Sequence, residues 1–371
     1  MAAAPSPRKP ALLYALASMG MGHAVRAEPL IAHLREHYEV IVFTGGPAHA
    51  YLSARFPDVR RIHRPRYFFR GNRVAPDLIY LYILVTSPLI VWSLCRLWWA
   101  RLTRRPVALL TDFETQSIWS ALLVRPLFRL PIVSLDNQGM FRFADPPGMP
   151  ASEAKRLEAI RFQAWTVVPF ADRYLVANFA QPALRDARAA YVPPPIRDDV
   201  LARLPRARAA DGTAPVLAYL GLRREPGLQQ TLEATGLRFV VFGAERDEDV
   251  GQVQFRRFAH DAYLDALADA PFVLVSAGHS SICDALALGK PVLAYPSQGQ
   301  FEQELNGHAV EALGVGRALK AIEAGPIADF ARNLAGYRAA VLERFHGATP
   351  FFDNRQCFVT VDATLRALTG G

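Results

Sequence analysis

VSAGHSSICDALALGKPVLAYPSQGQFEQELN, residues 275–306, places small and polar residues directly behind two apolar runs. The first run ends in Ala277-Gly278, and the second, PVLAYPS, spans residues 291–297. A segment long enough for a helix separates them. Apolar runs without alternation are typical of strands covered on both faces, as in parallel sheets with helical crossovers. The stretch therefore predicts an α/β fold with polar turns at the carboxyl ends of its strands.

The same succession of apolar runs and helical segments, such as those at 24–36 and 152–164, continues through most of the 371 residues. It breaks at a polar, glycine- and proline-containing stretch around 206–215, which we interpret as a linker. We predict two tandem Rossmann-like, doubly wound α/β domains facing across a cleft. These are residues 1–205 and residues 206–345, with a helix in 346–371 returning to the first domain. The expected strands are 11–18, 40–46, 107–113, 131–137, 173–178, 215–221, 238–244, 254–258, 271–278 and 291–297.

The basic charge of the chain is confined to its first part. Residues 1–200 contain 25 Lys+Arg against 15 Asp+Glu, a net charge of +10, whereas the rest contains 17 against 19, a net charge of −2. A basic first half favours an anionic partner, either a membrane or a nucleic acid. An arginine-rich surface that serves only solubility explains the same numbers. The arginines form no recognised nucleic-acid-reading motif, so we expect no nucleic acid partner.

The three cysteines are scattered and odd in number, which argues against a disulfide framework or a zinc cluster. The first ten residues lack the apolar core of a secretion signal. Both observations favour a reducing, cytoplasmic location.

One apolar segment departs from the α/β pattern. Residues 78–95 contain no charge, and Arg96, a Leu-Trp-Trp-Ala run and further arginines follow, up to residue 105. Three interpretations are open: a transmembrane helix, which Pro88 and the position inside a domain disfavour, a wholly buried crossover helix, or a helix lying in the membrane interface. In the third, tryptophans lie at the headgroup level beside arginines. The residues expected to contact the membrane are Trp92, Trp98, Trp99 and Arg101.

A glycine loop followed by a histidine comes directly after the first expected strand. Gly20 and Gly22, in SMGMGHAVRAEPL at 18–30, allow a sharp turn, and His23 then begins a helix. A histidine at a helix start beside a strand end suits general-base catalysis near neutral pH. A histidine that only hydrogen-bonds the turn is the alternative.

Two aspartates follow other strands of the same sheet. The fourth strand lies beside the first in the doubly wound order, so Asp112 is expected near His23, where its carboxylate would fix the imidazole tautomer. Asp136, one strand further out, is the competing carboxylate on this side of the site. Capping of the next helix is the alternative role for Asp112.

The stretch at 275–306 carries polar groups at two adjacent strand ends. Ser280 and Ser281 begin a helix, where N–H groups and hydroxyls bind phosphate, and Asp284 is placed to accept hydrogen bonds from ribose hydroxyls. Ordinary capping boxes explain one such cluster more readily than two. The turn after the next strand adds groups that suit sugar hydroxyls: Gln300, Glu302 and Gln303.

With these motifs the chain resembles the GT-B glycosyltransferases, in particular the family-28-like branch that includes MurG and the diacylglycerol galactosyltransferases. The resemblance covers nearly the whole chain. SAGHSSICDALALGKPVLAYPSQGQFEQELN is similar to the family's Gly-Gly-x-x-Ser-x-x-Glu, Gly-x-Pro and Gln-Glu-Gln-x-x-Asn pattern, and MGMGH to its amino-terminal glycine loop. Two departures are present. Ala277 stands where the family has its first glycine, and Asp284 is one methylene shorter than the family's glutamate.

The resemblance implies roles for individual residues. His23 is the implied catalytic base and Asp112 its partner. The backbone near Phe258 and His260 is implied to contact the nucleotide base. The helix-start serines are implied to contact the phosphates, and Asp284 the ribose. The implied donor-binding residues are Gly221, Arg223, Arg224, Phe258, Gly278, His279, Ser280, Ser281, Asp284, Glu302, Gln303 and Asn306.

The resemblance also implies a reaction. The resemblance implies that a sugar passes from a nucleotide diphosphate, with UDP preferred, to a hydroxyl of a lipid or lipid-linked acceptor at the cytoplasmic face of the plasma membrane, with inversion at the anomeric carbon. No Asp-x-Asp motif appears at the end of an expected strand in either domain, so arginines and a helix N-terminus are expected to neutralise the leaving diphosphate, without a metal or other cofactor. The alternatives are a nucleotide-sugar 2-epimerase of the same fold and a non-catalytic protein that binds lipid or nucleic acid.

Overall fold

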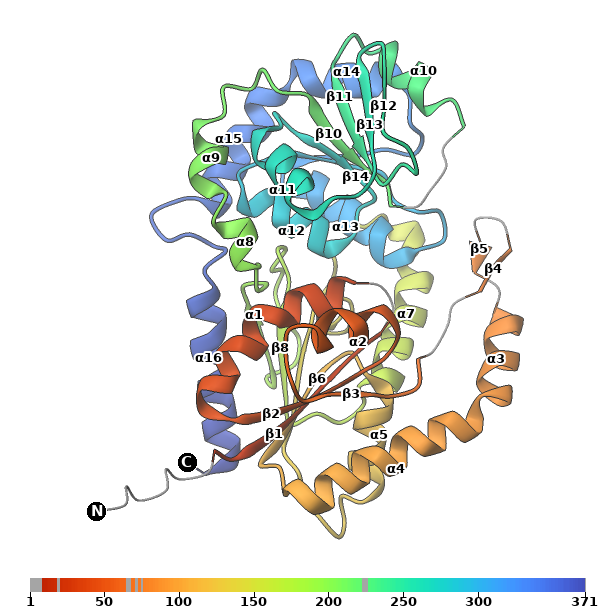
Figure 1. Ribbon diagram of the computed structural model, residues 1–371, viewed down its shortest axis with the longest axis vertical. Coiled ribbons are helices and arrows are strands. Elements are labelled where there is room, and N and C mark those ends of the chain that lie inside the picture. Colours follow the sequence, from red (N-terminus) through yellow and green to blue (C-terminus); the bar gives the residue numbers. More distant parts are fainter. Residues whose placement is uncertain are drawn as a thin grey trace. The chain divides into compact units, whose positions relative to one another are not determined.

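The structure of the chain, a computed structural model, describes residues 9–18, 21–64, 68–70, 73–74, 76–221 and 226–370. These residues form two compact units (Figure 1). Unit 1 comprises Met1–Ala144, Ala154–Pro195 and Asn354–Gly371, and unit 2 comprises Asp145–Glu153 and Ile196–Asp353.

The division between the units falls ahead of the linker predicted at 206–215. Two short helices, α8 (Asp198–Leu201) and α9 (Leu204–Ala209), belong to unit 2 because α9 packs on α11 (His260–Asp269). The last helix, α16 (Asn354–Thr369), belongs to unit 1.

Unit 1, as far as its residues are described, is built on a seven-stranded sheet in the order β3-β2-β1-β6-β7-β8-β9, with every pair parallel. Strand β1, inside the sheet between β2 and β6, is buried at every residue, in keeping with its unbroken apolar run. The strands are β1 (Ala11–Leu16), β2 (Glu39–Thr44), β3 (Val59–Arg61), β6 (Ala108–Asp112), β7 (Ile132–Asp136), β8 (Arg173–Ala177) and β9 (Ala189–Val192).

Two layers of helices cover this sheet. α1 packs on α2 and α16, whereas α4 packs on α5, which packs on α7. Strands β1 to β3 and strands β6 to β8 progress in opposite directions across the sheet, so right-handed crossovers place the two layers on opposite faces. The helices of unit 1 are α1 (Gly22–His37), α2 (Gly46–Ser53), α3 (Pro76–Val85), α4 (Ser87–Arg104), α5 (Thr115–Leu123), α6 (Gly139–Phe143), α7 (Ala154–Val167) and α16.

The core on the α1 side of the sheet is shared by both ends of the chain. Leu30 and Leu34 of α1 lie in one buried cluster with Cys357, Val361 and Leu365 of α16. Each of these side chains is fully buried. The apolar stripe of α16 therefore completes the interior of unit 1.

Unit 2 repeats the architecture, with seven strands among its described residues in the order β12-β13-β11-β10-β14-β15-β16. Neighbours are parallel except at the β12–β13 edge. The strands are β10 (Val216–Tyr219), β11 (Phe239–Phe242), β12 (Glu248–Val250), β13 (Val253–Arg256), β14 (Val273–Val275), β15 (Val292–Ala294) and β16 (Gly316–Ala318). The remaining helices are α10 (Leu228–Glu233), α12 (His279–Ala287), α13 (Phe301–Ala312), α14 (Ala324–Arg332) and α15 (Leu334–Phe345).

The predicted fold class, two doubly wound α/β sheets in tandem, is confirmed. Each expected strand corresponds to an observed one, and the helices expected at 24–36 and 152–164 correspond to α1 and α7. The edge strands β3, β9, β12 and β16 and the hairpin of β4 (Phe69–Arg70) with β5 (Arg73–Val74) were not predicted. They are only two to four residues long, too short to be recognised as strands from an apolar run.

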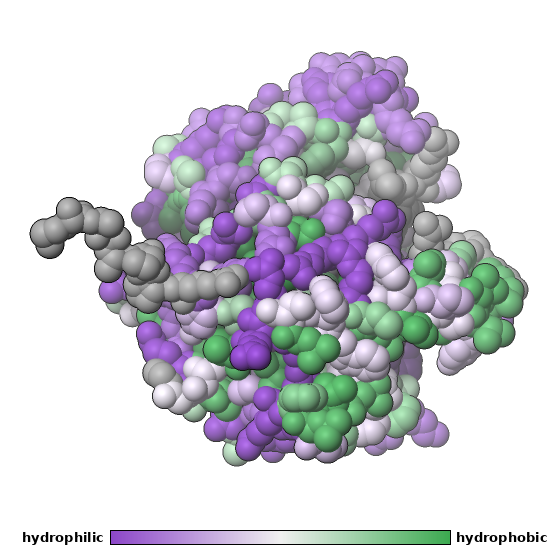
Figure 2. Space-filling view, turned by 60° about the horizontal axis from the view of Figure 1, so that its bottom comes forward, coloured by the Kyte–Doolittle hydropathy of each residue, from purple (hydrophilic) through white to green (hydrophobic). Residues whose placement is uncertain are grey.

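The apolar segment at 78–95 forms parts of two helices. The axes of α3 and α4 differ by 61°, and the break precedes Pro88 in the first turn of α4. Among the described helices none is long and apolar enough by itself to cross a membrane, and the bent pair passes that test by length and composition only. A wholly buried crossover helix is wrong, because Tyr80, Leu84 and Trp99 are 73%, 71% and 66% exposed. On the side of the molecule drawn in Figure 2, apolar surface gathers at the right and in the lower part of the view.

Candidate active site

A buried charged cluster lies at the carboxyl ends of β1 and β6. His23, the second residue of α1, follows β1, and Asp112 ends the neighbouring strand β6. Nδ1 of His23 lies 2.9 Å from Oδ1 of Asp112. The His23 side chain is 12% exposed and that of Asp112 only 1%. The strand order thus brings these two predicted residues together.

Arg26, one helical turn after His23, completes the cluster. Its Nη2 atom donates to both oxygens of Asp112, at 2.6 and 2.8 Å, and its Nη1 atom donates to Oδ1 of Asn137 at 2.8 Å. Burial alone would raise the pKa of Asp112, but the guanidinium of Arg26 and the ring of His23 hold that pKa below its ordinary value. Asp112 is therefore a carboxylate at neutral pH.

An ionised Asp112 selects one tautomer of His23. A carboxylate only accepts hydrogen bonds, so the Nδ1 atom facing it carries the proton and Nε2 carries the lone pair. The guanidinium of Arg26, 3.2 Å from Nδ1, sits beside the same edge of the ring. An imidazole in this state can take a proton from a hydroxyl group at Nε2.

Asp136, the competing carboxylate, serves the turn before α6. Its Oδ1 atom accepts from the backbone N–H of Gly139 at 2.7 Å, and its Oδ2 atom accepts from the hydroxyl of Ser134. Burial raises the pKa of Asp136. The ring of His23 therefore pairs with Asp112. Of the two predicted loop glycines, Gly22 is the first residue of α1 and Gly20 lies outside the described residues.

The turn after β14 in unit 2 has a strained backbone. Ala277 adopts a φ of 41°, in the left-handed region that favours glycine, at the position where the resembling family has its first glycine. Gly278 is the N-cap of α12, so the helix begins at His279, one residue earlier than expected. Ser280 and Ser281, half-buried, fall in its first turn, where the backbone N–H groups of a helix start point outward from the helix. His279 itself is buried, 3.7 Å from the sulfur of Cys283.

Asp284 lies beside Arg197, an arginine from a distant segment of the chain. Nη2 of Arg197 is 3.7 Å from Oδ2 of Asp284, which is beyond hydrogen-bond distance. Nη1 of Arg197 lies 3.1 Å from Nε2 of His260, which lies 2.6 Å from Oδ2 of Asp199. Burial raises the pKa of Asp284 to about 6, since the charge of Arg197 offsets only part of the effect.

Two predicted residues of α13 hydrogen-bond to the backbone of the turns that follow β14 and β15. The Oε1 atom of Gln303 accepts from the backbone N–H of Ser297 at 2.8 Å. Asn306 is fully buried and donates through Nδ2 to the carbonyl oxygen of Ala277 at 3.1 Å. Asn306 therefore stabilises the turn after β14 through a buried hydrogen bond. Glu302, half-buried in the first turn of α13, lies nearer the surface.

An aromatic group flanks the end of β10. The ring of Phe258, half exposed, lies 5.6 Å from that of Tyr219 and 5.3 Å from that of Tyr263, measured between centroids. Gly221, just after β10, has a φ of 71°. The predicted Arg223 and Arg224 lie outside the described residues.

The predicted membrane-contact residues are only partly exposed. Trp92 and Trp99 are exposed, and the guanidinium of Arg96 stacks 4.7 Å from the ring of Trp92. Trp98 is half-buried and donates through Nε1 to the carbonyl oxygen of Ser120 at 2.9 Å. Arg101 donates to the backbone carbonyl oxygens of Ala121 and Phe128, so it links α4 to α5 and to the loop after α5.

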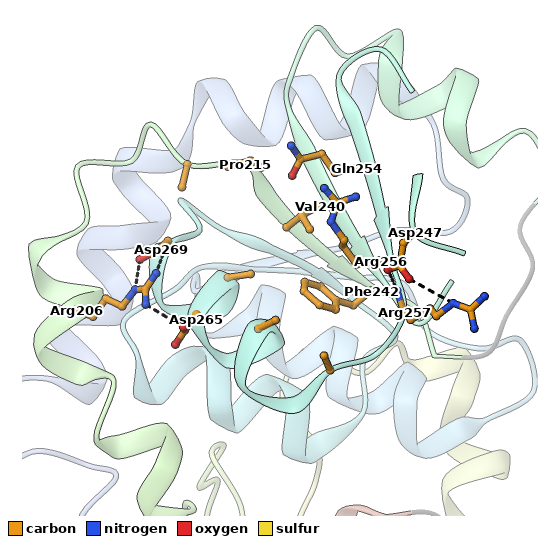
Figure 3. A pocket seen from close by; sticks show the side chains of 14 residues that line it. Arg206, Pro215, Val240, Phe242, Asp247, Gln254, Arg256, Arg257, Asp265 and Asp269 are labelled. Carbon is orange, nitrogen blue, oxygen red and sulfur yellow. Dashed lines mark hydrogen bonds and ion pairs between the residues drawn. The ribbon is translucent and has the colours of Figure 1, made fainter. Parts of the chain in front are cut away.

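A hollow of about 350 Å³ lies elsewhere in unit 2, against β11, β13 and α11 (Figure 3). Val240 and Phe242 supply part of its apolar lining, and ion pairs such as that of Arg206 with Asp269 lie at its rim. None of the described donor-binding candidates lines it. The hollow and the predicted donor site are therefore different places. In the part of the chain that the structure describes, no three His, Cys, Asp or Glu side chains gather as a metal site, and metal independence stays a prediction.

Sequence reasoning missed the two buried arginines. Arg26 had a local signal, because it follows His23 by three residues and so shares its face of the helix. Arg197 had none, since it reaches Asp284 from a segment far away in the sequence.

A family model described as Glycosyl transferase family 1 matches residues 11–335. An uncharacterized glycosyltransferase of Methanosarcina acetivorans is 39% identical over 67 residues, and one of Methanosarcina mazei is 37% identical over 67 residues. Each match covers 18% of this chain and 17% of the relative, so the similarity spans under a fifth of these relatives' length.

Solved structures match over nearly the whole chain. The glycotransferase of kitacinnamycin has a TM-score of 0.68 at 16% identity, covering 97% of this chain and 99% of its own. UGT2 of Phytolacca americana, solved with UDP-2fluoro-glucose and pterostilbene, has a TM-score of 0.67 at 14% identity, covering 98% and 100%. At these identities the likeness shows the fold alone, and that fold is the predicted GT-B type. The narrower family-28-like assignment stays a prediction, since the matching family model is that of family 1.

Proposed function

The chain belongs to the family described as glycosyl transferase family 1, and we propose that it transfers a sugar from a nucleotide diphosphate, preferably UDP, to a hydroxyl group of a lipid or lipid-linked acceptor. One observation carries the proposal: the ring of His23 lies 2.9 Å from the buried, ionised Asp112 at a strand end. A general base for a hydroxyl acceptor needs this support.

In the proposed step, Nε2 of His23 removes the proton of the acceptor hydroxyl. The hydroxyl oxygen bonds to the anomeric carbon while the bond between that carbon and the diphosphate oxygen breaks, and the nucleotide diphosphate leaves with the electron pair. Attack opposite the leaving group inverts the anomeric configuration. Asp112 stabilises the imidazolium that forms, and Arg26 keeps Asp112 charged and in place.

Unit 2 supplies the proposed donor site. The N–H groups at the start of α12, with Ser280 and Ser281, suit the diphosphate, because a helix N-terminus attracts anions. Asp284, one turn further along α12, suits the ribose hydroxyls, and the exposed ring of Phe258 offers an apolar face for the base. These groups carry the leaving charge without a metal, so we propose that EDTA leaves turnover unchanged.

The exposed helices α3 and α4 support the proposed lipid acceptor. Their outward side chains are apolar, and arginines flank them at Arg96 and Arg105. We propose reversible, peripheral contact with the cytoplasmic leaflet, driven by apolar insertion and attraction to anionic headgroups. The protein is then expected to sediment with anionic vesicles and to be released in part by high salt.

Incubation with radiolabelled nucleotide sugars and a lipid extract tests the reaction. Label in the lipid fraction supports the proposal, whereas an epimerised donor with no labelled lipid supports the 2-epimerase. Recovery of unchanged donor contradicts both.

Calorimetry tests the donor site. UDP affinity should fall about tenfold or more in Ser281→Leu and in Asp284→Ala, the loss expected for hydrogen bonds to charged groups. Ser152→Leu, at an exposed serine of unit 2, is the matched control. Unchanged affinity in both site variants contradicts this donor site.

A further inference from the structure

The helix layer of α4, α5 and α7 exposes apolar side chains well beyond the segment 78–105. All five tryptophans of the chain lie in this layer, although it forms only one face of unit 1. Tryptophan is enriched where a membrane meets water, because its ring is apolar and carries a single polar N–H group. The tryptophans are Trp92, Trp98 and Trp99 on α4, Trp119 on α5 and Trp165 on α7.

A second apolar surface adjoins α4 on this layer. Leu127, in the loop after α5, is 79% exposed, and Phe162 of α7 is 67% exposed. The ring of Trp165 lies 5.9 Å from that of Phe162 and 6.0 Å from that of Phe170, so the aromatic side chains form one group. We call this surface the α5–α7 face, and its residues are Trp119, Leu123, Leu127, Phe128, Phe162, Trp165 and Phe170.

Two polar side chains at this surface already have partners inside the protein. Nε1 of Trp119 donates to the carbonyl oxygen of Thr166 at 3.0 Å. Arg125 donates to the carbonyl oxygen of Phe170 at 3.2 Å and to Oδ1 of Asp172 at 2.8 Å. Entry of these aromatic rings into an apolar medium therefore leaves no indole N–H of Trp119 unpaired, which removes the main cost of burying such a residue.

The exposed charge on α4, α5 and the loop after α5 is positive, and on α7 the basic residues Lys155, Arg156 and Arg161 outnumber the exposed Glu158. Between residues 87 and 131 the carboxylates are Asp112 and Glu114, and both are buried. Arg129, next to Phe128, is exposed. A surface of this kind is complementary to anionic phospholipid headgroups over an apolar interior. The basic residues of the same segment are Arg96, Arg101, Arg104, Arg105, Arg125 and Arg129.

We propose that the α5–α7 face lies in the headgroup region of an anionic phospholipid bilayer together with α4. The whole α4–α5–α7 layer, and not α3–α4 alone, then forms the membrane-binding side of unit 1. This inference rests on the membrane contact proposed for α3–α4 and adds a second surface to it. The exposed charge between residues 87 and 131 is all positive, which favours an anionic membrane over a second copy of the chain, whose facing surface would be equally basic.

Tryptophan fluorescence tests this inference, because every emitting tryptophan lies in the layer. Vesicles of phosphatidylcholine and phosphatidylglycerol in equal parts, with brominated acyl chains, should quench the emission, and pure phosphatidylcholine vesicles should quench it far less. Replacing both Trp119 and Trp165 by Phe should lower the quenched emission, since two of the inserted rings no longer emit.

A binding variant gives the second measurement. Phe162→Ser with Phe170→Ser should lower partition into the anionic vesicles about tenfold, the effect of losing part of the burial of two rings. Val359→Ser, at an exposed aliphatic residue of α16 in the opposite layer, is the matched control and should bind as the wild type does. If the melting temperature shows that the double variant does not fold, Phe162→Ser alone serves, with a smaller expected loss.

The outcomes separate this inference from the proposed function. Wild-type binding with unchanged partition of the variant, or quenching that the α4 tryptophans fully explain, overturns the α5–α7 face and leaves the α3–α4 contact standing. A wild-type dimer that the variant converts to monomers, with unchanged vesicle binding, assigns the surface to a second copy and overturns it as well. No binding of the wild type to any vesicle overturns the proposed membrane contact and this inference together, without touching the donor site, which UDP calorimetry tests separately.

Discussion

Each unit buries an aspartate beside an arginine and a histidine, but the two clusters differ in the state of the carboxyl group. In unit 1 the guanidinium of Arg26 contacts both oxygens of Asp112 within 2.8 Å, and the pKa of Asp112 is lowered. In unit 2 the guanidinium of Arg197 stays 3.7 Å from Asp284, and burial raises the pKa of that carboxyl to about 6. Both aspartates are buried, but Arg26 and the ring of His23 outweigh the effect of burial on the pKa of Asp112, whereas the more distant Arg197 offsets only part of it for Asp284.

This difference fits two different tasks. A carboxylate that stays charged holds a histidine in one tautomer throughout a reaction. A carboxyl that gains or loses its proton near pH 6 has room for further hydrogen bonds, which the hydroxyls of a bound ribose would supply. The two clusters share residue types and burial, and they differ in the distance between arginine and carboxylate, which suits the proposed base in unit 1 and the proposed donor site in unit 2.

The largest difference between the clusters is expected in catalysis. His23→Ala should lower turnover by about two to four orders of magnitude, the usual contribution of a general base, with UDP affinity nearly unchanged. His260→Ala removes the histidine of the other cluster and should leave turnover within about tenfold of the wild type. Steady-state kinetics of the two variants gives the comparison. Equal losses would mean that the proposed base is misassigned.

The second difference is expected in stability. Arg26→Met leaves the carboxylate of Asp112 buried without its main partner and should cost about 3–5 kcal/mol of unfolding free energy. Arg197→Met breaks a contact that is already beyond hydrogen-bond distance to Asp284 and should cost about 1 kcal/mol. Urea unfolding, followed by hydrogen exchange in α1 and α12, reports the two units separately. A larger loss in Arg197→Met would reverse the comparison.

The pH dependence of stability should have opposite signs in the two units. The pKa of Asp112 is lowered by folding, so its contribution is present above its ordinary value of 3.8 and is lost as pH falls through the folded value. The pKa of Asp284 is raised, so its contribution is present below 3.8 and is lost as pH rises through about 6. Each is measured as the stability difference between the wild type and the Asn variant across pH. Differences of the same sign in both variants would contradict the assigned charges.

The smallest effect concerns the turns that carry the two clusters. Phe113, directly after Asp112, and Ala277, after β14, both have positive φ, at 54° and 41°, although neither is glycine. A residue with a side chain pays about 1–2 kcal/mol in this region. Ala277→Gly should therefore raise stability by up to about 1 kcal/mol once the loss of the buried methyl is subtracted. Thermal unfolding measures it, and a loss of stability would show that the methyl contact outweighs the strain.

The sequence was enough to predict the fold and two residues of the buried cluster in unit 1, His23 and Asp112. Long apolar runs identified the inner strands. The doubly wound strand order predicted that Asp112 lies near His23, as the structure shows. The edge strands were not predicted because runs of two to four residues are too short to identify a strand. The role of Arg197 was not predicted because its partner, Asp284, belongs to a helix far away in the sequence. The α5–α7 face was not predicted because the spacing of apolar residues among charges on α7 does not distinguish a side that faces a core from one that faces solvent.

The position of α16 in the core of unit 1 sets an order for folding during synthesis. The side chains that cover Leu30 and Leu34, those of Val361 and Leu365, are synthesised more than 300 residues later. Unit 2, which ends at Asp353, is complete before them. The unit that begins the chain is therefore the later one to close, and until then its nascent sheet exposes an apolar face to chaperones.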